Sequence, residues 1–359
     1  MLIGAYYYIW YGSPIVPIVG GGDWERSGST NTPVLGRYNS RDEAVISKHF
    51  DWAKEAGIDF FAISWSNVGS WDDESLKNYY LKKSAGSGVK FCIFYDSIPA
   101  LNRHRFNAYS NYDFNESFSP NKTKGEKFVE DFEYLAENYF NRPDYLKING
   151  RPVVIIYNAS GFKNIQSYFD KIKENMAKRG ISLFLIADAV CWPGIKITRN
   201  NLGFLWENSP KEAFKVILRA LGRLTFNNLK EISFEQYFDA ITGYNMYAVN
   251  RADNFLNNID DLYKKFYSYA KSQKVRFVPN VMPGYDDRQL MGLENPVLKR
   301  EEGSFYKNFW KVAVKYLDPD IKMALITTFN EWHEGTEIEP SKEHQSRYLE
   351  ATKEFKNNS

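Results

Sequence analysis

Residues 58–65 read Ile58-Asp59-Phe60-Phe61-Ala62-Ile63-Ser64-Trp65. This run has the length of one β-strand, and its core is apolar on both faces, as expected for a parallel strand covered by helices. A turn cluster and then a helical pattern over 72–85 follow it. The stretch therefore predicts one strand–turn–helix unit.

The same unit recurs along the chain. Strand-like runs start near Leu2, Ile58, Val89, Pro152, Ser182, Ala240, Arg276 and Met323. Helical patterns cover 41–56, 72–85, 126–140, 163–178, 210–221, 254–272, 304–316 and 343–356. This alternation predicts an α/β protein, a single (β/α)₈ TIM barrel over residues 1–359. A doubly wound open sheet is the alternative, but no GxGxxG follows the first run.

Extra length falls between some predicted strands and the helices that follow them. The long segments are 12–40, 97–125, 190–209 and 284–303. In a barrel such loops lie at the C-terminal face, where active sites are built. We therefore expect extended loops on the functional end of one catalytic domain.

The composition excludes several classes of protein. Lys plus Arg is 46 and Asp plus Glu is 44, a near-balance that argues against an electrostatically driven nucleic-acid binder. The apolar content of 43% excludes a disordered chain, and two Cys exclude a disulfide scaffold. The aromatic content of 17% is high, which fits either a well-packed core or a surface that grips sugars.

The apolar runs are too short to span a bilayer, so no membrane contact is expected. The first residues, Met1 to Tyr11, show no basic start and no small-residue cleavage site. We expect a cytoplasmic protein if the chain is complete, and a secreted one if a leader was trimmed.

The densest group of chemically active residues follows the last predicted strand, within 327–340. Glu331 and Glu334 lie three residues apart there. Of two carboxyl groups that share a pocket, one can stay ionised while the other holds a proton, because like charges push their pKa values apart. Glycoside hydrolysis needs such a pair. Glu337 and Glu339 are expected to lie in a solvated acidic turn.

His333-Glu334-Gly335-Thr336-Glu337 is not a His-Glu-x-x-His zinc motif, since Glu337 replaces the second His. We therefore expect no metal and no cofactor.

Aromatic and hydrogen-bonding residues end nearly every predicted strand. Aromatic faces stack on sugar rings, and carboxylates and amides bind hydroxyls. The same rings could stack on the bases of single-stranded nucleic acid, but the charge balance and the paired Glu favour a sugar. The expected substrate-binding residues are Tyr7, Tyr8, Trp10, Trp65, Tyr95, Asp96, Tyr157, Asn158, Tyr244, Tyr285, Asn330, Trp332 and His333.

Residues 329–339, Phe329-Asn330-Glu331-Trp332-His333-Glu334-Gly335-Thr336-Glu337-Ile338-Glu339, resemble the FNEWHEGTQIE signature of glycoside hydrolase family 99. That family contains endo-α-mannosidases and endo-α-mannanases, with WbsX-like relatives in polysaccharide gene clusters. Four further segments, 7–14, 38–42, 63–65 and 279–287, resemble its motifs in the same order.

The resemblance implies a retaining, metal-independent glycosidase without an enzyme nucleophile. Glu331 would act as base on the sugar's 2-hydroxyl, which attacks its own anomeric carbon to give a 1,2-anhydro sugar. Glu334 would protonate the leaving oxygen and then deprotonate water. The expected substrate is an α-mannoside-like oligosaccharide or polysaccharide, cleaved by endo action.

Some positions depart from the family pattern. Its strand-three Glu is the shorter Asp96 here, and its strand-four YDSY reads Tyr157-Asn158-Ala159-Ser160. These departures concern the sugar-binding positions, not the catalytic pair, so they leave the identity of the sugar open. The alternative function is a non-hydrolytic carbohydrate-binding or glycan-processing barrel of a surface-polysaccharide pathway.

Overall fold

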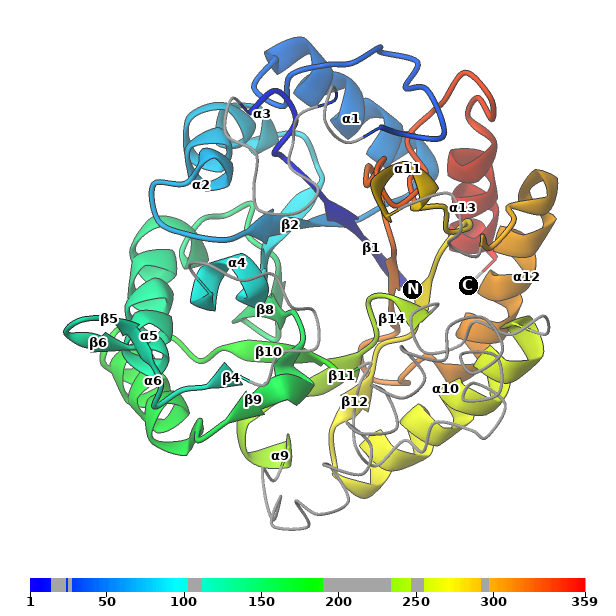
Figure 1. Ribbon diagram of the computed structural model, residues 1–359. Coiled ribbons are helices and arrows are strands. Elements are labelled where there is room, and N and C mark those ends of the chain that lie inside the picture. Colours follow the sequence, from blue (N-terminus) through cyan, green and yellow to red (C-terminus); the bar gives the residue numbers. More distant parts are fainter. Residues whose placement is uncertain are drawn as a thin grey trace.

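The computed structural model describes residues 1–13, 24, 28–102, 112–189, 234–246, 255–291 and 297–358. All eight predicted strands are present, and they surround a common axis (Figure 1). They are β1 (Leu2–Tyr7), β2 (Phe60–Trp65), β3 (Lys90–Tyr95), β8 (Arg151–Ile156), β10 (Phe184–Asp188), β11 (Ala240–Thr242), β12 (Arg276–Phe277) with β13 (Asn280–Val281), and β14 (Met323–Ile326).

The sheet closes on itself through the seventh predicted strand, which is split in two. The strand order is β12-β11-β10-β8-β3-β2-β1-β14-β13, and every pair along this path is parallel. The path thus begins and ends within residues 276–281. Pro279, which has no N–H to donate to a ladder, lies at the break. The predicted barrel is confirmed.

Helices ring the strands, as Figure 1 shows. The main ones are α1 (Glu43–Ala56), α2 (Trp71–Ser75) continued by η1 (Leu76–Tyr80) and α3 (Leu81–Ser84), α5 (Lys124–Leu135) continued by η2 (Ala136–Phe140), α6 (Gln166–Lys178), α9 (Phe234–Tyr237), α10 (Phe255–Ser272), α12 (Ser304–Ala313) continued by η6 (Val314–Tyr316), and α13 (Arg347–Asn357). The predicted helix over 210–221 and the predicted loop 190–209 lie outside the described residues.

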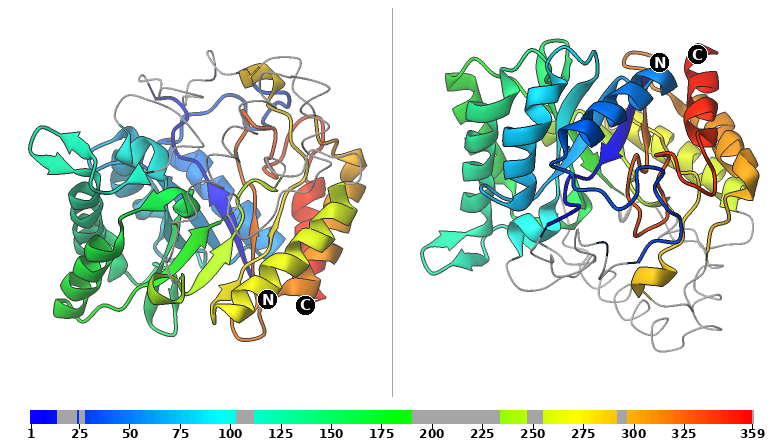
Figure 2. Two further views of the ribbon diagram at one scale, coloured as in Figure 1. Left: turned by 60° about the horizontal axis from the view of Figure 1, so that its bottom comes forward. Right: turned by 90° about the horizontal axis from the view of Figure 1, so that it is seen from above.

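Smaller elements decorate one end of the barrel. Figure 2 places α4 (Ser97–Leu101), α11 (Arg288–Met291) and the hairpin of β5 (Ser117–Ser119) and β6 (Lys122–Thr123) at the same end. These elements follow the carboxyl ends of β3 and β13, so they belong to the expected extended loops.

Short elements elsewhere complete the fold. They are β4 (Tyr112–Asp113), β7 (Lys147–Ile148), η3 (Ala159–Gly161), β9 (Phe162–Lys163) and η5 (Glu301–Gly303).

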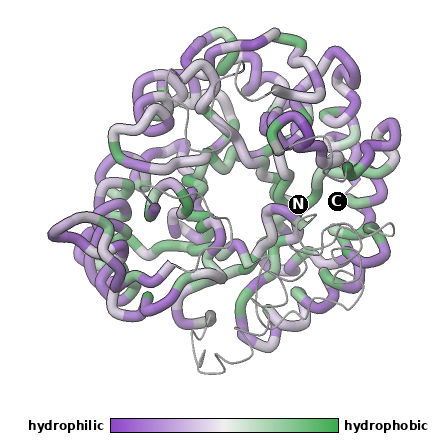
Figure 3. The backbone as a smooth tube through the Cα atoms, viewed as in Figure 1, coloured by the Kyte–Doolittle hydropathy of each residue, from purple (hydrophilic) through white to green (hydrophobic). Residues whose placement is uncertain are grey.

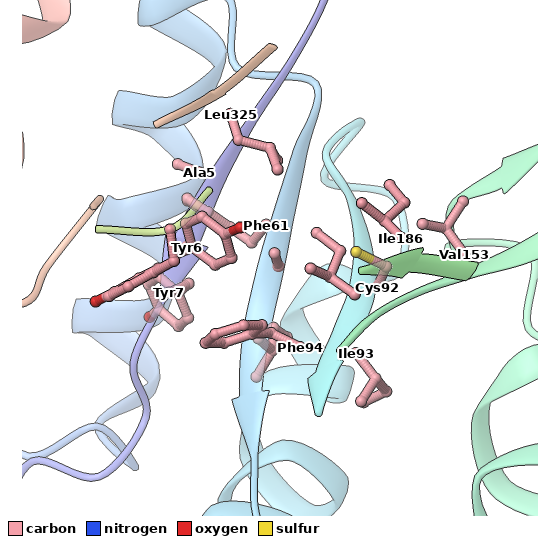
Figure 4. Close-up of a cluster of buried hydrophobic side chains, with 14 of the residues drawn as sticks. Ala5, Tyr6, Tyr7, Phe61, Cys92, Ile93, Phe94, Val153, Ile186 and Leu325 are labelled. Carbon is pink, nitrogen blue, oxygen red and sulfur yellow. The ribbon is translucent and has the colours of Figure 1, made fainter. Parts of the chain in front are cut away.

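The strands carry an apolar core on both faces. Figure 3 shows hydrophobic stretches gathered in the central strands, and Figure 4 shows side chains of β1, β2 and β3 packed together. Inside the barrel, the ring of Tyr6 lies with its centroid 4.6 Å from that of Phe94. Gly4 must remain small, because a Cβ there would lie 2.1 Å from Cζ of Phe60.

The two ends of the chain lie side by side in Figure 1 and in both views of Figure 2. The Lys356 ammonium on α13 donates to the carbonyl of Met1 (2.7 Å) and to Asp59 Oδ2 (2.6 Å). Within the described ranges, no helix combines the length and apolar character that a membrane crossing would need.

Candidate active site

The loop after β14 folds back on itself and carries the predicted catalytic pair. The amide of Thr328 donates to the carbonyl of Thr336 (2.8 Å), and the amide of Glu331 donates to the hydroxyl of Thr328 (2.7 Å). Gly335 has φ +59°, and a Cβ at this position would lie 2.9 Å from the carbonyl oxygen of Asp286. These contacts hold residues 328–336 in one shape at the carboxyl end of the barrel, and we call this segment the catalytic loop after its predicted carboxyl pair.

Glu331 is buried, with 3% of its surface exposed. Its Oε1 accepts a hydrogen bond from the amide of His333 (3.0 Å), whereas its Oε2 has no hydrogen-bond partner among the described residues. Burial, and then repulsion by Glu334, raises the pKa of Glu331 well above its usual value. Glu331 thus has one oxygen held by the backbone and one buried oxygen to which no described residue donates a hydrogen bond.

Glu334 is only partly buried and lies in a different environment. Its Oε2 accepts a hydrogen bond from the hydroxyl of Tyr244 (3.3 Å). Burial, followed by repulsion from Asp287 and Asp96, raises the pKa of Glu334 to about 7. A carboxyl group with a pKa near neutrality can both give and take a proton.

Two tyrosines link opposite sides of the barrel beside Glu334. The hydroxyl of Tyr8, just after β1, donates to the hydroxyl of Tyr244 (2.6 Å), which in turn donates to Glu334. The ring of Trp10 lies 4.3 Å from that of Tyr8, and the ring of Tyr157 lies 5.6 Å from that of Tyr244. The structure therefore brings four of the expected substrate-binding residues together.

Asp188, at the end of β10, fixes two neighbouring strand ends. Its Oδ1 accepts from the amide of Tyr244 (3.0 Å) and its Oδ2 from the amide of Asn158 (3.1 Å). Asn158 has φ +51°, a left-handed conformation that asparagine tolerates. Asp188 thus sets the positions of two expected site residues.

Asp96 directly follows β3, at a further strand end. Asp96 caps α4 by accepting from the amide of Ile98 (3.4 Å), and burial, together with the charge of Asp72, raises its pKa to about 7. Asp96 also lies close enough to Glu334 for its charge to raise the pKa of Glu334.

Tyr285 donates to Asp287 Oδ2 (3.0 Å) and lines a cavity of about 250 Å³ beside Gly335. The cavity adjoins the Glu334 backbone, because the amide of Asp286, another lining residue, donates to the carbonyl of Glu334 (2.8 Å).

Three expected substrate-binding residues point away from the site. The hydroxyl of Tyr7 pairs with Nδ1 of His49 on α1 (2.9 Å), the indole of Trp65 donates to Asp73 on α2 (2.8 Å), and the hydroxyl of Tyr95 donates to Asp131 on α5 (2.9 Å). All three are at most 1% exposed. They pack between sheet and helices, because neighbouring residues of a strand face opposite sides. We do not retain them as substrate-binding residues.

Asn330, Trp332 and His333 are buried within the catalytic loop. Asn330 uses its side-chain amide on the backbone of Tyr8: Oδ1 accepts from the Tyr8 amide (2.8 Å), and Nδ2 donates to the Tyr8 carbonyl (2.8 Å). The Trp332 indole donates to Glu339 Oε2 (3.1 Å), and Nδ1 of His333 faces the carbonyl of Gly28 (3.4 Å). These contacts give the three residues a structural role in the loop.

The expectation of a solvated acidic turn at Glu337 and Glu339 is wrong. Glu337 is 1% exposed and Glu339 is 2% exposed. Glu337 Oε1 pairs with Arg300 (2.5 Å) and accepts from Nδ2 of Asn31 (2.7 Å). Residues distant in sequence bury these carboxylates, and the pattern of neighbouring residues in the sequence does not predict such contacts.

Sequence reasoning did not assign roles to several residues that shape the site. Thr328 holds the Glu331 amide, Asp188 holds two strand ends, and Asp287 raises the pKa of Glu334. The available signals were positional: Asp188 ends a predicted strand, Thr328 lies in segment 327–340, and Asp287 lies in segment 279–287. In the part of the chain that the structure describes, no cluster of three potential metal ligands occurs.

Comparison with known proteins finds similar chains. A family model described as "Glycosyltransferase WbsX" matches residues 29–352. A mouse "glycoprotein endo-alpha-1,2-mannosidase-like protein" is 25% identical over 93% of this chain and 68% of its own length. The rat "glycoprotein endo-alpha-1,2-mannosidase" is 23% identical over 94% of this chain and 67% of its own length.

Among solved structures, the GH99 endo-α-mannosidase from Bacteroides thetaiotaomicron, in complex with bis-tris propane, superposes with a TM-score of 0.66 at 21% identity. The superposition covers 99% of this chain and 96% of that enzyme. Since the family model covers most of the sequence, the chain belongs to the WbsX family and has the barrel fold of glycoside hydrolase family 99.

Proposed function

We propose that this protein is a retaining glycoside hydrolase in which residues 1–359 act as one catalytic barrel domain. Glu331 and Glu334 are the catalytic residues. The observation that carries the proposal is their unequal environment: one carboxyl group is fixed and buried with a free oxygen, and the other titrates near neutrality beside a tyrosine relay.

The resemblance to glycoside hydrolase family 99 assigns the two roles. Burial raises the pKa of Glu331, but the backbone N–H at Oε1 favours the ionised form that a base needs, and Oε2 is the oxygen that would accept the proton of a sugar 2-hydroxyl. Glu334 has a pKa of about 7 and can protonate the leaving oxygen. The 2-hydroxyl oxygen then attacks the anomeric carbon as the glycosidic bond breaks, giving a 1,2-anhydro sugar. Glu334 next deprotonates the water that attacks the anomeric carbon, the bond from that carbon to the 2-oxygen breaks, and Glu331 returns its proton to the 2-oxygen, so the configuration is retained.

The substrate we propose is an α-mannoside-like glycan cleaved by endo action. The named relatives are endo-α-mannosidases, which supports this choice. Tyr8, Trp10, Tyr157 and Tyr244 provide aromatic faces for sugar rings, and Asp96 and Asn158 lie where hydroxyls can be bound. No cofactor, metal or nucleic acid is needed for the chemistry.

The family description, "Glycosyltransferase WbsX", favours a second candidate: transfer or binding of a glycan without hydrolysis. Both candidates use the same site residues. In transfer, an acceptor sugar rather than water reaches the anomeric carbon after the first bond breaks, and in binding alone no bond breaks.

Product analysis tests the proposal. The protein is incubated with α-mannans and high-mannose oligosaccharides, with and without an acceptor sugar, and products are read by mass spectrometry. Hydrolysis products are expected from the wild type. Glu331→Gln and Glu334→Gln should each lower the rate by at least ~10²-fold. Glu354→Gln is the control, because Glu354 is an exposed α13 carboxylate paired with Lys307. A normal rate in either site variant would refute the catalytic assignment, and transfer products alone would favour the second candidate.

Modified substrates test the role of the 2-hydroxyl. A substrate methylated at the 2-hydroxyl of the cleaved residue cannot form the 1,2-anhydro sugar and should not be cleaved. Cleavage of that substrate at the normal rate would show that another nucleophile is used.

A further inference from the structure

Glu339 is a buried carboxylate at the centre of a hydrogen-bond network behind the catalytic loop. Its Oε1 lies 3.2 Å from Nε2 of His49 on α1. Its Oε2 accepts from the hydroxyl of Tyr38 (2.8 Å) and from the indole of Trp332 (3.1 Å). The carboxylate is therefore satisfied at both oxygens, although it is almost completely removed from water.

Each partner of Glu339 is attached to a segment that carries a site residue. The hydroxyl of Tyr38 also accepts from Nδ2 of Asn330 (3.2 Å), which precedes Glu331. Trp332 follows Glu331 in the loop, and its amide donates to the hydroxyl of Tyr11 (3.1 Å). Glu331 is thus held on both sides by residues linked to Glu339.

The same network reaches Tyr8 by two routes. Nδ1 of His49 pairs with the hydroxyl of Tyr7, the residue before Tyr8. Asn330 clamps the amide and the carbonyl of Tyr8 itself. Since the Tyr8 hydroxyl begins the relay to Glu334, both catalytic carboxyl groups depend on this network for their orientation.

We propose that Glu339 is a positioning residue of the active site, which holds the Glu331 segment and the end of β1 in register through Tyr38, Trp332 and His49. The proposal rests on the function proposed above. Misplacing a reacting group by about 1 Å can cost on the order of 10²-fold in rate, so weakening the network should lower kcat without removing substrate contacts.

A second buried carboxylate provides a matched control. Asp73 on α2 is 1% exposed and accepts from the indole of Trp65 (2.8 Å) and from the hydroxyls of Tyr134 (2.6 Å) and Tyr139 (2.6 Å). Like Glu339, it receives indole and phenol donors between sheet and helices. Unlike Glu339, it has no hydrogen bond to the catalytic loop among the described residues.

The experiment compares Tyr38→Phe with Tyr139→Phe. Each substitution keeps the aromatic ring but removes the tyrosine hydroxyl that donates to one of the two buried carboxylates. On the proposal, Tyr38→Phe lowers kcat by roughly 10-fold or more while KM stays within about twofold, and Tyr139→Phe leaves kcat within about twofold. Melting temperatures are measured for both variants, so that lost stability is separated from lost positioning.

A second variant keeps the test decisive. Glu339→Gln keeps the side-chain volume but replaces one carboxylate oxygen with an NH₂ group in a site with two assigned donors, Tyr38 and Trp332, so it should also lower kcat with KM unchanged. Unchanged kcat in both Tyr38→Phe and Glu339→Gln, or an equal loss in Tyr139→Phe, would overturn the proposal. A wild type that cleaves no glycan would instead refute the proposed function, so the two failures are distinguishable.

Discussion

On the proposed mechanism, the charge of Asp287 should set the pH range over which Glu334 acts as an acid. Asp287 is 4% exposed and accepts from the hydroxyl of Tyr285. It is the largest electrostatic cause, after burial, of the rise in the pKa of Glu334 from 4.5 to about 7. Asp287→Asn keeps the shape and an oxygen for Tyr285, but removes the negative charge.

Removing that charge should lower the pKa of Glu334, because its ionised form is then less repelled. A nearby like charge accounts for roughly one pKa unit, equivalent to about 1.4 kcal/mol. Only protonated Glu334 can donate to the leaving oxygen, so the variant should lose activity on the alkaline side. A one-unit shift lowers kcat/KM by about tenfold well above pH 7 and leaves it nearly unchanged near pH 5.

The assay is the pH profile of kcat/KM on a glycan that the wild type cleaves, whose alkaline limb reports the acid of the free enzyme. Asp260→Asn is the control, because Asp260 lies on α10 and pairs with Lys315. An alkaline limb that stays in place or moves upward in Asp287→Asn would refute the reasoning, as would the same downward shift in Asp260→Asn.

Three further perturbations have expected outcomes. Tyr244→Phe removes a hydrogen bond that lowers the pKa of Glu334, so the alkaline limb should move upward, opposite to Asp287→Asn; a downward shift would contradict this. Thr328→Val removes the acceptor of the Glu331 amide and should lower kcat by roughly 10-fold or more, with recovery in Thr328→Ser; equal rates in both variants would argue against this role. Glu334→Gln removes a group whose pKa is about 7 in the folded protein and 4.5 in the unfolded chain. In the wild type, protonation of Glu334 therefore stabilises the folded state below pH 4.5, and this contribution is lost as pH rises through about 7. Denaturant unfolding should therefore show the variant gaining stability relative to wild type between pH 4 and pH 8, by at most about 3 kcal/mol, and a constant difference would contradict it.

The barrel itself could be predicted from local patterns. Apolar runs such as 60–65 and the helical periodicities between them depend on neighbours a few residues apart, and all eight strands appear where these runs lie. The split at Pro279 and the small strands of the loops could not be predicted in this way, because they depend on which strands or segments become neighbours.

The direction of the strand-end aromatics was the main limit of prediction. Parallel strands covered by helices are apolar on both faces, so no alternation tells which side faces the barrel interior. Tyr6 and Tyr7 look equivalent in the sequence, yet Tyr6 packs inside the barrel against Phe94 and Tyr7 packs outside against His49.

The sequence by itself determined the alternation of strands and helices and the close spacing of Glu331 and Glu334, because both are set by residues adjacent in the chain. Only the tertiary structure decided how these carboxyl groups differ. The proton affinity of Glu334 depends on Asp287, Asp96 and Tyr244, and the support of Glu331 depends on Glu339, Tyr38 and His49. Burial and electrostatic repulsion act through space, so the chemistry of the pair arises only when the barrel brings distant strand ends together.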